Sequence, residues 1–287
     1  MRLGTRASAL ALAQARWVAQ RLPGEVELVE ITTAGDLARD RGTQPASPAG
    51  TSDKSRWTGA LERALVEGEI DLAVHSAKDV PGELADGTEI VAVPARADPR
   101  DVLVGAASLA GLAQGARVGT SSVRRRAQLL AVRPDLEVVE LRGNVDTRLR
   151  KLAAGAVDAL VLAAAGLERL GRGSDVVSAP LEGDVFVPAP GQGCLALQAR
   201  TGDRFDAVDD AAAHAALAEE RAAVARFDAS CNTPVGVHRG PDRLAGFVGL
   251  PDGSEWLIDA APDAQRLADR MLAAGAADLL ARAEAMA

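Results

Sequence analysis

Aromatic side chains are scarce in this sequence. Phe, Trp and Tyr together account for 2% of its 287 residues, and Tyr does not occur at all. Ala, Leu and Val must therefore fill the core. Large rings are what proteins use to stack against flat ligands, so we do not expect aromatic stacking to be the main way in which this chain recognises a ligand.

Cysteine is almost as rare, with Cys194 and Cys231 as the two examples. Two cysteines do not make the disulfide framework of a small secreted protein. Neither lies at metal-ligand spacing from a His. We therefore expect a reducing compartment and no bound metal.

Long apolar runs are missing too. The N-terminal segment MRLGTRASALALAQARWV contains no apolar stretch of the length found in signal peptides. No window approaches the ~20 apolar residues that a membrane-spanning helix needs. We expect a cytoplasmic protein that does not bind membranes.

An excess of positive charge is also absent, because the net charge is −8. Proteins that bind nucleic acid normally carry a basic surface, so we expect no nucleic-acid partner. The apolar fraction of 48% and the charged fraction of 25% are typical of a globular protein. The length predicts two or three domains.

Predicted strands alternate with predicted helices through the first part of the chain. The strands are expected at 26–31, 70–75, 88–93, 117–120, 137–143 and 157–163, and the helices at 8–22, 58–68, 121–133 and 146–155. This alternation predicts parallel sheets and an α/β fold. A helix at 209–227, short strands and a terminal helix from Asp263 predict a smaller α+β domain at the end.

Three polar loops follow predicted strands, and in parallel sheets ligands bind beyond the carboxyl ends of the strands. The loops read HSAKDVP, GTSSVRRR and LRGNVDTRLR. In the second loop, the hydroxyls of Thr120 and Ser122 precede a helix N-terminus, a geometry that binds anions. Arg124 and Arg125 add planar forks that suit carboxylates. The alternative is a capped helix with a solvated basic face.

Further arginines gather near predicted strand ends. Arg6 follows a first strand in GTRAS, Arg142 stands at the end of the strand 137–143, Arg148 lies on the next helix, and Arg169 follows the strand 157–163. An acidic chain that gathers arginines in this way suggests a ligand with several carboxylates rather than one phosphate. The sequence has neither a G-x-x-x-x-G-K-[ST] loop nor a G-x-G-x-x-G fingerprint. The segment 41–55, rich in Pro, Gly, Ser and Thr, is long enough to be a functional lid.

Two residues are candidates for chemistry. Asp79 stands at a strand end beside Lys78, where a carboxylate can stabilise a developing cation and move protons. The alternative for Asp79 is a turn residue before Val-Pro. Cys231 can act as a nucleophile if its surroundings favour the thiolate, and the alternative is a small buried apolar residue. We expect His75 to support the Asp79 loop rather than to titrate in catalysis.

Taken together, these motifs resemble the porphobilinogen deaminase family over nearly the whole chain. The matching segments include GTRASALALAQA, DLAVHSAKDVP, GTSSVRRRAQL, LRGNVDTRLRKL, PAPGQGCLALQ and SCNTPVG. The resemblance implies three domains, at 1–95 with 189–207, at 96–188, and at 208–287. The first two are expected to be related doubly wound α/β domains like those of a periplasmic binding protein, and the third a small α+β domain.

The resemblance also implies an activity. Four porphobilinogen units would be joined, with loss of ammonia, into the linear tetrapyrrole hydroxymethylbilane on a dipyrromethane cofactor held by a thioether to Cys231. Asp79 would protonate the leaving amine and stabilise the cation formed as ammonia departs, together with Lys78 and Arg6. The chain would act as a monomer.

The same resemblance assigns binding roles. The cofactor would contact Asp79, Lys78, Ser8, Thr120, Ser122, Arg124, Arg125 and Arg148, and the substrate would contact Arg6, Arg142, Arg148, Arg169 and Lys54. Ala229 and Ser230 fill the places before Cys231 where the family commonly has two glycines. The rival hypothesis is a carboxylate-binding protein of the same fold without catalysis, which would need neither Cys231 nor Asp79.

Overall fold

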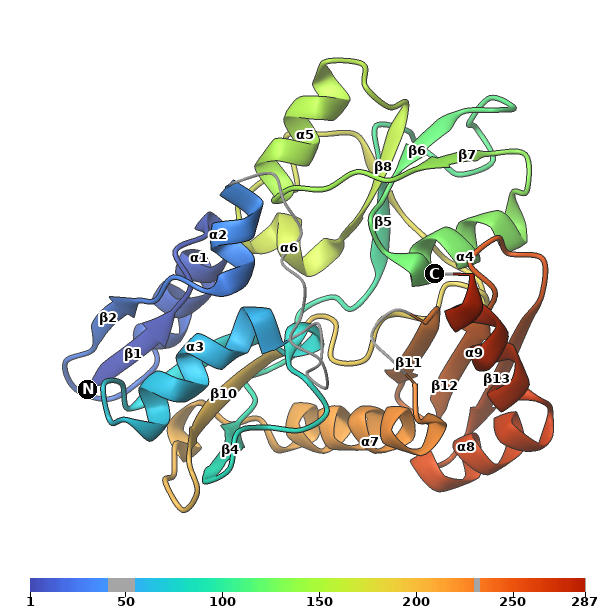
Figure 1. Cartoon of the computed structure of the whole chain (residues 1–287). Coiled ribbons are helices and arrows are strands. Elements are labelled where there is room, and N and C mark those ends of the chain that lie inside the picture. The colour runs from blue at the N-terminus through green and yellow to red at the C-terminus, as the bar shows by residue number, and fades with distance from the viewer. Residues whose placement is uncertain (41–54, 230–232, 287) are drawn as a thin grey trace. The chain divides into compact units, whose positions relative to one another are not determined.

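The computed structural model describes residues 1–40, 55–229 and 233–286 (Figure 1). The chain forms two compact units: Met1–Ala97 with Gly193–Leu217, and Asp98–Gln192 with Ala218–Ala287. We call them unit 1 and unit 2. The predicted division into three domains is finer than this and stays a prediction. Within the described part, no helix is long and apolar enough to cross a membrane.

Unit 1 is built on a five-stranded sheet in the order β2-β1-β3-β10-β4. Strand β1 runs parallel to β2 and β3, whereas β10 runs antiparallel to β3 and β4. The strands are β1 Arg2–Thr5, β2 Glu27–Glu30, β3 Leu72–Ser76, β4 Thr88–Ala92 and β10 Leu195–Arg200. The helices are α1 Ala9–Ala19, α2 Ala34–Asp40, α3 Ser55–Val66, and the short 3-10 turns η1 Ala77–Asp79 and η2 Asp206–Val208.

Unit 2 contains a second five-stranded sheet with a matching order, β7-β6-β8-β5-β9. Here β6 is parallel to β7 and β8, and β5 is antiparallel to β8 and β9. The strands are β5 Asp101–Val104, β6 Arg117–Gly119, β7 Glu137–Val139, β8 Ala159–Ala163 and β9 Ser178–Pro180, and the helices are α4 Val123–Val132, α5 Val145–Ala153 and α6 Ala164–Arg169. The α/β prediction is confirmed, but both sheets are mixed rather than parallel.

The antiparallel strand of each sheet has a simple origin. Strand β5 follows soon after the chain enters unit 2 at Asp98, and β10 follows its return to unit 1 at Gly193. The chain therefore reaches β5 and β10 directly after it passes from one unit to the other. No crossover helix within the same unit leads into either strand. The parallel direction of the remaining strands comes from βαβ connections, which require it.

The C-terminal part of unit 2 is a small α+β layer, as predicted. Helix α7 Ala211–Phe227, of which the residues up to Leu217 belong to unit 1, leads into an antiparallel sheet of β11 Val235–Arg239, β12 Leu244–Gly249 and β13 Trp256–Ala261. Two helices follow, α8 Ala264–Ala273 and α9 Ala276–Ala285, where one terminal helix was predicted. In Figure 1 the orange and red α8 and α9 lie along this sheet. Their apolar faces share one core with it, which includes Val237, Leu244, Leu267 and Met271.

Local sequence explains where the helices begin. Ser8 accepts a hydrogen bond from the Ala11 amide and caps α1, and Ser122 accepts one from the Arg125 amide and caps α4. Such caps satisfy amides that have no partner inside the helix. The cores between helices and sheets are mainly aliphatic, as the shortage of aromatics predicts, with Phe227 and Phe247 as their buried rings.

The turn between β12 and β13 packs against α4 within unit 2. Gly253 has a φ of +71°, and a Cβ at this position would lie 2.5 Å from the Ala131 amide nitrogen of α4. The Arg126 Nε atom donates a hydrogen bond of 3.3 Å to the Pro251 carbonyl in the same turn. Only glycine fits this contact, which fastens the C-terminal layer to the helix that carries Arg124 and Arg125.

We predict that Gly253→Ala destabilises unit 2 more than Gly155→Ala does. Gly155 has the same φ of +71°, but no atom lies within 4 Å of a Cβ placed there. Both variants force alanine into the left-handed region, so the difference isolates the clash with α4. Overpacking of this kind costs about 1–3 kcal/mol. Urea unfolding of the two variants measures that difference, and equal values would contradict the close packing.

Candidate functional site

In unit 1, several predicted site residues meet at the carboxyl ends of the parallel strands. Arg6 follows β1, Ser8 caps α1, and Asp79 lies in η1 directly after β3. All three line a small hollow of about 60 Å³, together with His75 of β3 and Trp57 of α3. The structure therefore brings together residues that lie far apart in the sequence, at the edge of the sheet where ligands of α/β proteins bind.

Arg6 is held in place by neighbours on two sides. Its Nε and Nη2 atoms donate to the two oxygens of Asp36 at 3.1 and 2.5 Å, and its guanidinium lies 4.3 Å from the centre of the Trp57 ring. Asp36 is itself fixed by a 2.6 Å hydrogen bond from the Thr33 hydroxyl. The Arg6 side chain is 16% exposed. A paired and stacked arginine is oriented before a ligand arrives.

His75 is the buried titratable group of this hollow. Burial lowers the pKa of His75 to about 4, Gln198 raises that pKa, the Arg6 cation lowers it, and Asp79 raises it. Among the described residues, Nε2 of His75 makes no hydrogen bond of good geometry. The Gln198 amide nitrogen instead donates to Glu62 and Thr88, at 3.0 and 2.8 Å. At neutral pH, His75 is therefore an uncharged neighbour of Asp79 and Arg6.

We predict that His75 makes the protein less stable in acid. Its pKa in the folded chain is about 4, below the ordinary histidine value of 6.5, so the unfolded chain binds a proton first as the pH falls. Keeping His75 neutral contributes about 3 kcal/mol to the free energy of unfolding. This contribution is complete above pH 6.5 and is lost as the pH falls toward 4. Urea unfolding of wild type and His75→Gln at pH 7 and pH 4.5 tests this. If the difference in free energy of unfolding between wild type and His75→Gln is the same at both pH values, the prediction is wrong.

In unit 2, Arg124 and Arg125 converge on one buried carboxylate. Nη2 of Arg124 donates to Oδ2 of Asp101 at 2.8 Å, and Nε and Nη2 of Arg125 donate to Oδ1 at 3.0 and 2.7 Å. The side chains of Arg124, Arg125 and Asp101 are 5%, 8% and 3% exposed. Burial lowers the pKa of Arg124, Asp101 raises it and the Arg125 cation lowers it. The two arginines are thus a buried pair, not a solvated face.

The loops after β6 and β7 also touch each other. Nη2 of Arg148, on α5, donates to the Ser121 hydroxyl at 3.0 Å, and its Nε donates to the Gly143 carbonyl at 2.9 Å. Thr120 is buried and its hydroxyl accepts from the Ser122 amide at 3.2 Å. The sequence prediction that the GTSS and LRGN segments share one end of a sheet is therefore confirmed within unit 2.

The remaining predicted residues are placed less closely. Arg142 is exposed and pairs with Glu140 at 2.6 Å. Arg169 ends α6 and is half-buried, and Lys78 is half-buried beside Asp79 in η1. Lys54 and Cys231 lie outside the described residues, as does the segment 41–54.

Sequence reasoning missed two carboxylates of the site, Asp36 and Asp101. Asp36 follows Thr33 in a T-x-x-D pattern, which is a usable signal for the start of a helix. Asp101 had no such signal, because its arginine partners come 23 and 24 positions later in the chain.

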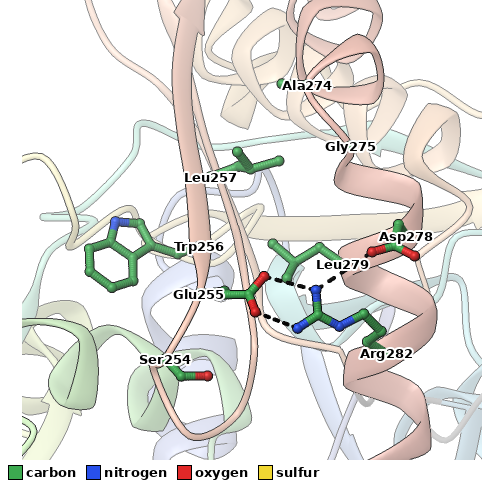
Figure 2. Close-up of a pocket in the computed structure, with 9 residues that line it drawn as sticks. All are labelled: Ser254, Glu255, Trp256, Leu257, Ala274, Gly275, Asp278, Leu279 and Arg282. Atoms are coloured by element: carbon green, nitrogen blue, oxygen red, sulfur yellow. Dashed lines mark hydrogen bonds and ion pairs between the residues drawn. The ribbon is translucent and has the colours of Figure 1, made fainter.

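A larger hollow in unit 2 contains none of the candidate residues (Figure 2). It has a volume of about 400 Å³ between the start of β13 and helix α9. Figure 2 shows Arg282 facing Glu255, to which it donates two hydrogen bonds of 2.8 and 2.5 Å, with Asp278 nearby at 3.6 Å. Its charged groups pair with one another, so the strand-end residues remain the better candidates. In the described ranges, no group of His, Cys, Asp and Glu could hold a metal ion.

The chain is similar in sequence to porphobilinogen deaminases. Residues 1–207 match the family model described as porphobilinogen deaminase, dipyromethane cofactor binding domain. The chain is 46% identical to a porphobilinogen deaminase of Roseiflexus castenholzii, covering 97% of this chain and 98% of that protein. It is 43% identical to the porphobilinogen deaminase of Deinococcus radiodurans, covering 97% of each.

Solved structures show only a distant likeness. A periplasmic substrate-binding protein of an ABC transporter from Coxiella burnetii is 16% identical with a TM-score of 0.41, over 77% of this chain and 96% of that one. A nutrient-binding protein of Burkholderia cenocepacia bound to methionine is 15% identical with the same TM-score, over 77% and 91%. Scores at this level carry no conclusion about function.

Proposed function

The chain belongs to the porphobilinogen deaminase family, and from that premise we propose how its own residues carry out the reaction. The activity is that of a porphobilinogen deaminase, which forms hydroxymethylbilane in tetrapyrrole biosynthesis. One observation carries the proposal: the Asp79 carboxylate, the Arg6 guanidinium and neutral His75 line the same hollow at the ends of β1 and β3.

We propose that Asp79 is the group that handles the proton and the charge. Each cycle breaks the bond between the aminomethyl carbon of the substrate and its nitrogen, and ammonia leaves. Asp79 would protonate the departing amine and then face the positive charge left on the substrate, which a carboxylate stabilises. The proton lost when the new carbon–carbon bond forms would return to the same carboxylate, so Asp79 would serve in every cycle.

Neighbouring groups in the hollow would support that role. Arg6, fixed by Asp36 and Trp57, would bind a substrate carboxylate and orient the aminomethyl group toward Asp79. His75 is uncharged at neutral pH, so it adds no second cation beside the cation that forms on the substrate. Lys78, next to Asp79 in η1, would add positive charge for carboxylates that belong to the cofactor.

We propose that the remaining cations bind the carboxylates of the substrate and the growing chain. Every porphobilinogen brings two carboxylates, so elongation needs many anchors. Guanidinium forks bind carboxylates with two parallel hydrogen bonds. The proposed anchors are Arg6, Lys54, Arg142, Arg148 and Arg169.

Residues of unit 2 fit the dipyrromethane cofactor that the matched family domain binds. Among the described residues, Arg124 and Arg125 share one acidic partner, Asp101, so the buried cluster keeps excess positive charge for an anionic group. When bound, the cofactor supplies the carbon to which new units are joined. We propose that Ser8, Lys78, Asp79, Thr120, Ser122, Arg124, Arg125 and Arg148 hold it, and that the thiol of Cys231 forms the thioether.

We also propose that the chain divides into three domains, at 1–95 with 189–207, at 96–188 and at 208–287. It would act as a monomer, and it would work in the cytoplasm. The resemblance to the family supports all three, and the small number of cysteines supports the last.

We predict that Asp79→Ala lowers turnover by roughly 10²–10⁴-fold, the usual contribution of a positioned acid or base. Porphobilinogen consumption measures the loss, and circular dichroism checks the fold. The control is Glu83→Ala, which removes an exposed carboxylate four positions later and should leave turnover unchanged. Turnover near the wild-type rate in Asp79→Ala would remove Asp79 from the reaction.

We predict that the purified protein is heavier than its sequence by one dipyrromethane unit. The excess should disappear in Cys231→Ala and persist in Cys194→Ala, because Cys194 is buried in the core of unit 1. Intact mass spectrometry measures it. A wild type that lacks the adduct, even after incubation with porphobilinogen, would favour the binding-protein alternative.

A further inference from the structure

We propose that Asp101 is a positioning residue that presents Arg124 and Arg125 to the anionic cofactor and fastens this pair to the segment by which the chain returns to unit 1. The inference rests on the proposed function, because it takes the two arginines as cofactor anchors. Asp101 itself touches neither substrate nor cofactor in this account and acts through its partners.

The contacts of Asp101 fix the direction of both guanidinium groups. Asp101 is the first residue of β5, and its carboxylate receives one bond from Arg124 and two from Arg125. Arg124 also donates to Gln128 and to the Val187 carbonyl at 2.8 and 2.9 Å, and Arg125 donates to the Val161 carbonyl at 3.0 Å. Each arginine therefore uses three of its five N–H donors, and Asp101 together with these neighbouring acceptors holds each guanidinium group in one orientation.

The charges in this cluster do not balance. Two guanidinium groups share one acidic partner in the described part of the chain, and all three side chains are nearly inaccessible to water. Without Asp101, two buried cations would face each other, which is strongly unfavourable. With it, the pair is stable and still carries net positive charge. Asp101 thus makes it possible to bury the arginines without neutralising them.

A second contact links the cluster to the returning chain. The Gln192 amide nitrogen donates to Oδ1 of Asp101 at 2.8 Å and to the Pro99 carbonyl at 2.6 Å. The preceding residue, Gly191, donates its amide to the buried Glu220 carboxylate at 2.7 Å. Gln192 is the last residue of unit 2 before the chain returns to unit 1. The arginine pair and this turn are therefore held by the same acceptor.

The experiment compares how fast apo-protein gains the cofactor. Wild type, Asp101→Asn, Asp101→Glu and Gln192→Leu are produced in a host that makes no porphobilinogen and are then incubated with porphobilinogen. Intact mass spectrometry follows the adduct with time. The matched control is Asp98→Asn, which removes a carboxylate paired with Arg100 in the same segment, but one whose side chain is 32% exposed.

We expect Asp101→Asn to gain the adduct at least tenfold more slowly than wild type, and Asp98→Asn to match wild type within twofold. Asp101→Glu restores the charge but shifts the two forks, so its rate should lie between those of wild type and Asp101→Asn. Gln192→Leu leaves the arginine pair intact and should load within threefold of wild type. Urea unfolding of the same variants, measured beside the loading rate, separates the two roles, because a positioning role slows loading in protein that is still folded.

Several results would overturn the inference. A folded Asp101→Asn that loads at the wild-type rate would do so, and if this variant does not fold, an Asp101→Glu that loads like wild type would do so instead. Loading of Gln192→Leu as slow as that of Asp101→Asn would assign the effect to the turn rather than to the arginines. In each case, the proposed function is still supported if wild type carries the dipyrromethane adduct and Cys231→Ala does not. A wild type without any adduct would defeat the proposed function itself.

Discussion

Unit 2 depends on two buried carboxylates, Asp101 and Glu220, that bind the same short turn at residues 191–192. Asp101 precedes this turn in the sequence, and Glu220 follows it. Asp101 accepts a hydrogen bond from the side-chain amide of Gln192. Glu220 of α7 accepts hydrogen bonds from the backbone amides of Gly191 and of Arg239 in β11. A buried carboxylate is costly unless its oxygens are fully hydrogen-bonded. Both oxygens of Asp101 and both oxygens of Glu220 accept hydrogen bonds, and these bonds link the α/β sheet, the returning chain and the C-terminal layer of unit 2.

Local patterns predicted most of the fold, and long-range pairing accounts for the differences. Periodicity placed α1, α3, α4, α5 and α7 within a few residues, because this signal acts over one or two turns of helix, whereas α2 was not predicted. The direction of β5 and β10 could not be found in this way. Alternation of side chains is the same in parallel and antiparallel strands, and the partners of these strands are set by where the chain crosses between units.

The candidate site was predictable as a set of residues but not as a set of contacts. The motifs indicated Arg6, Asp79, Arg124 and Arg125 because each follows a strand, and strand ends gather in α/β sheets. The sequence did not show that the arginines are already paired. In both units, a carboxylate from another part of the chain orients an arginine in advance, Asp36 in unit 1 and Asp101 in unit 2. Such partners are set by tertiary structure alone.

The position of Trp57 under the Arg6 guanidinium gives the chain a built-in optical reporter. The sequence contains no Tyr and three Trp, so its near-ultraviolet emission arises from indole rings with no tyrosine background. Of the other two, Trp17 stacks on Arg21 at 3.7 Å, and Trp256 lines the hollow of the C-terminal layer, which contains none of the candidate site residues. A carboxylate that binds Arg6 changes the electric field across the Trp57 ring. We therefore expect arrival of an anionic ligand in the hollow of unit 1 to shift the fluorescence, without any label.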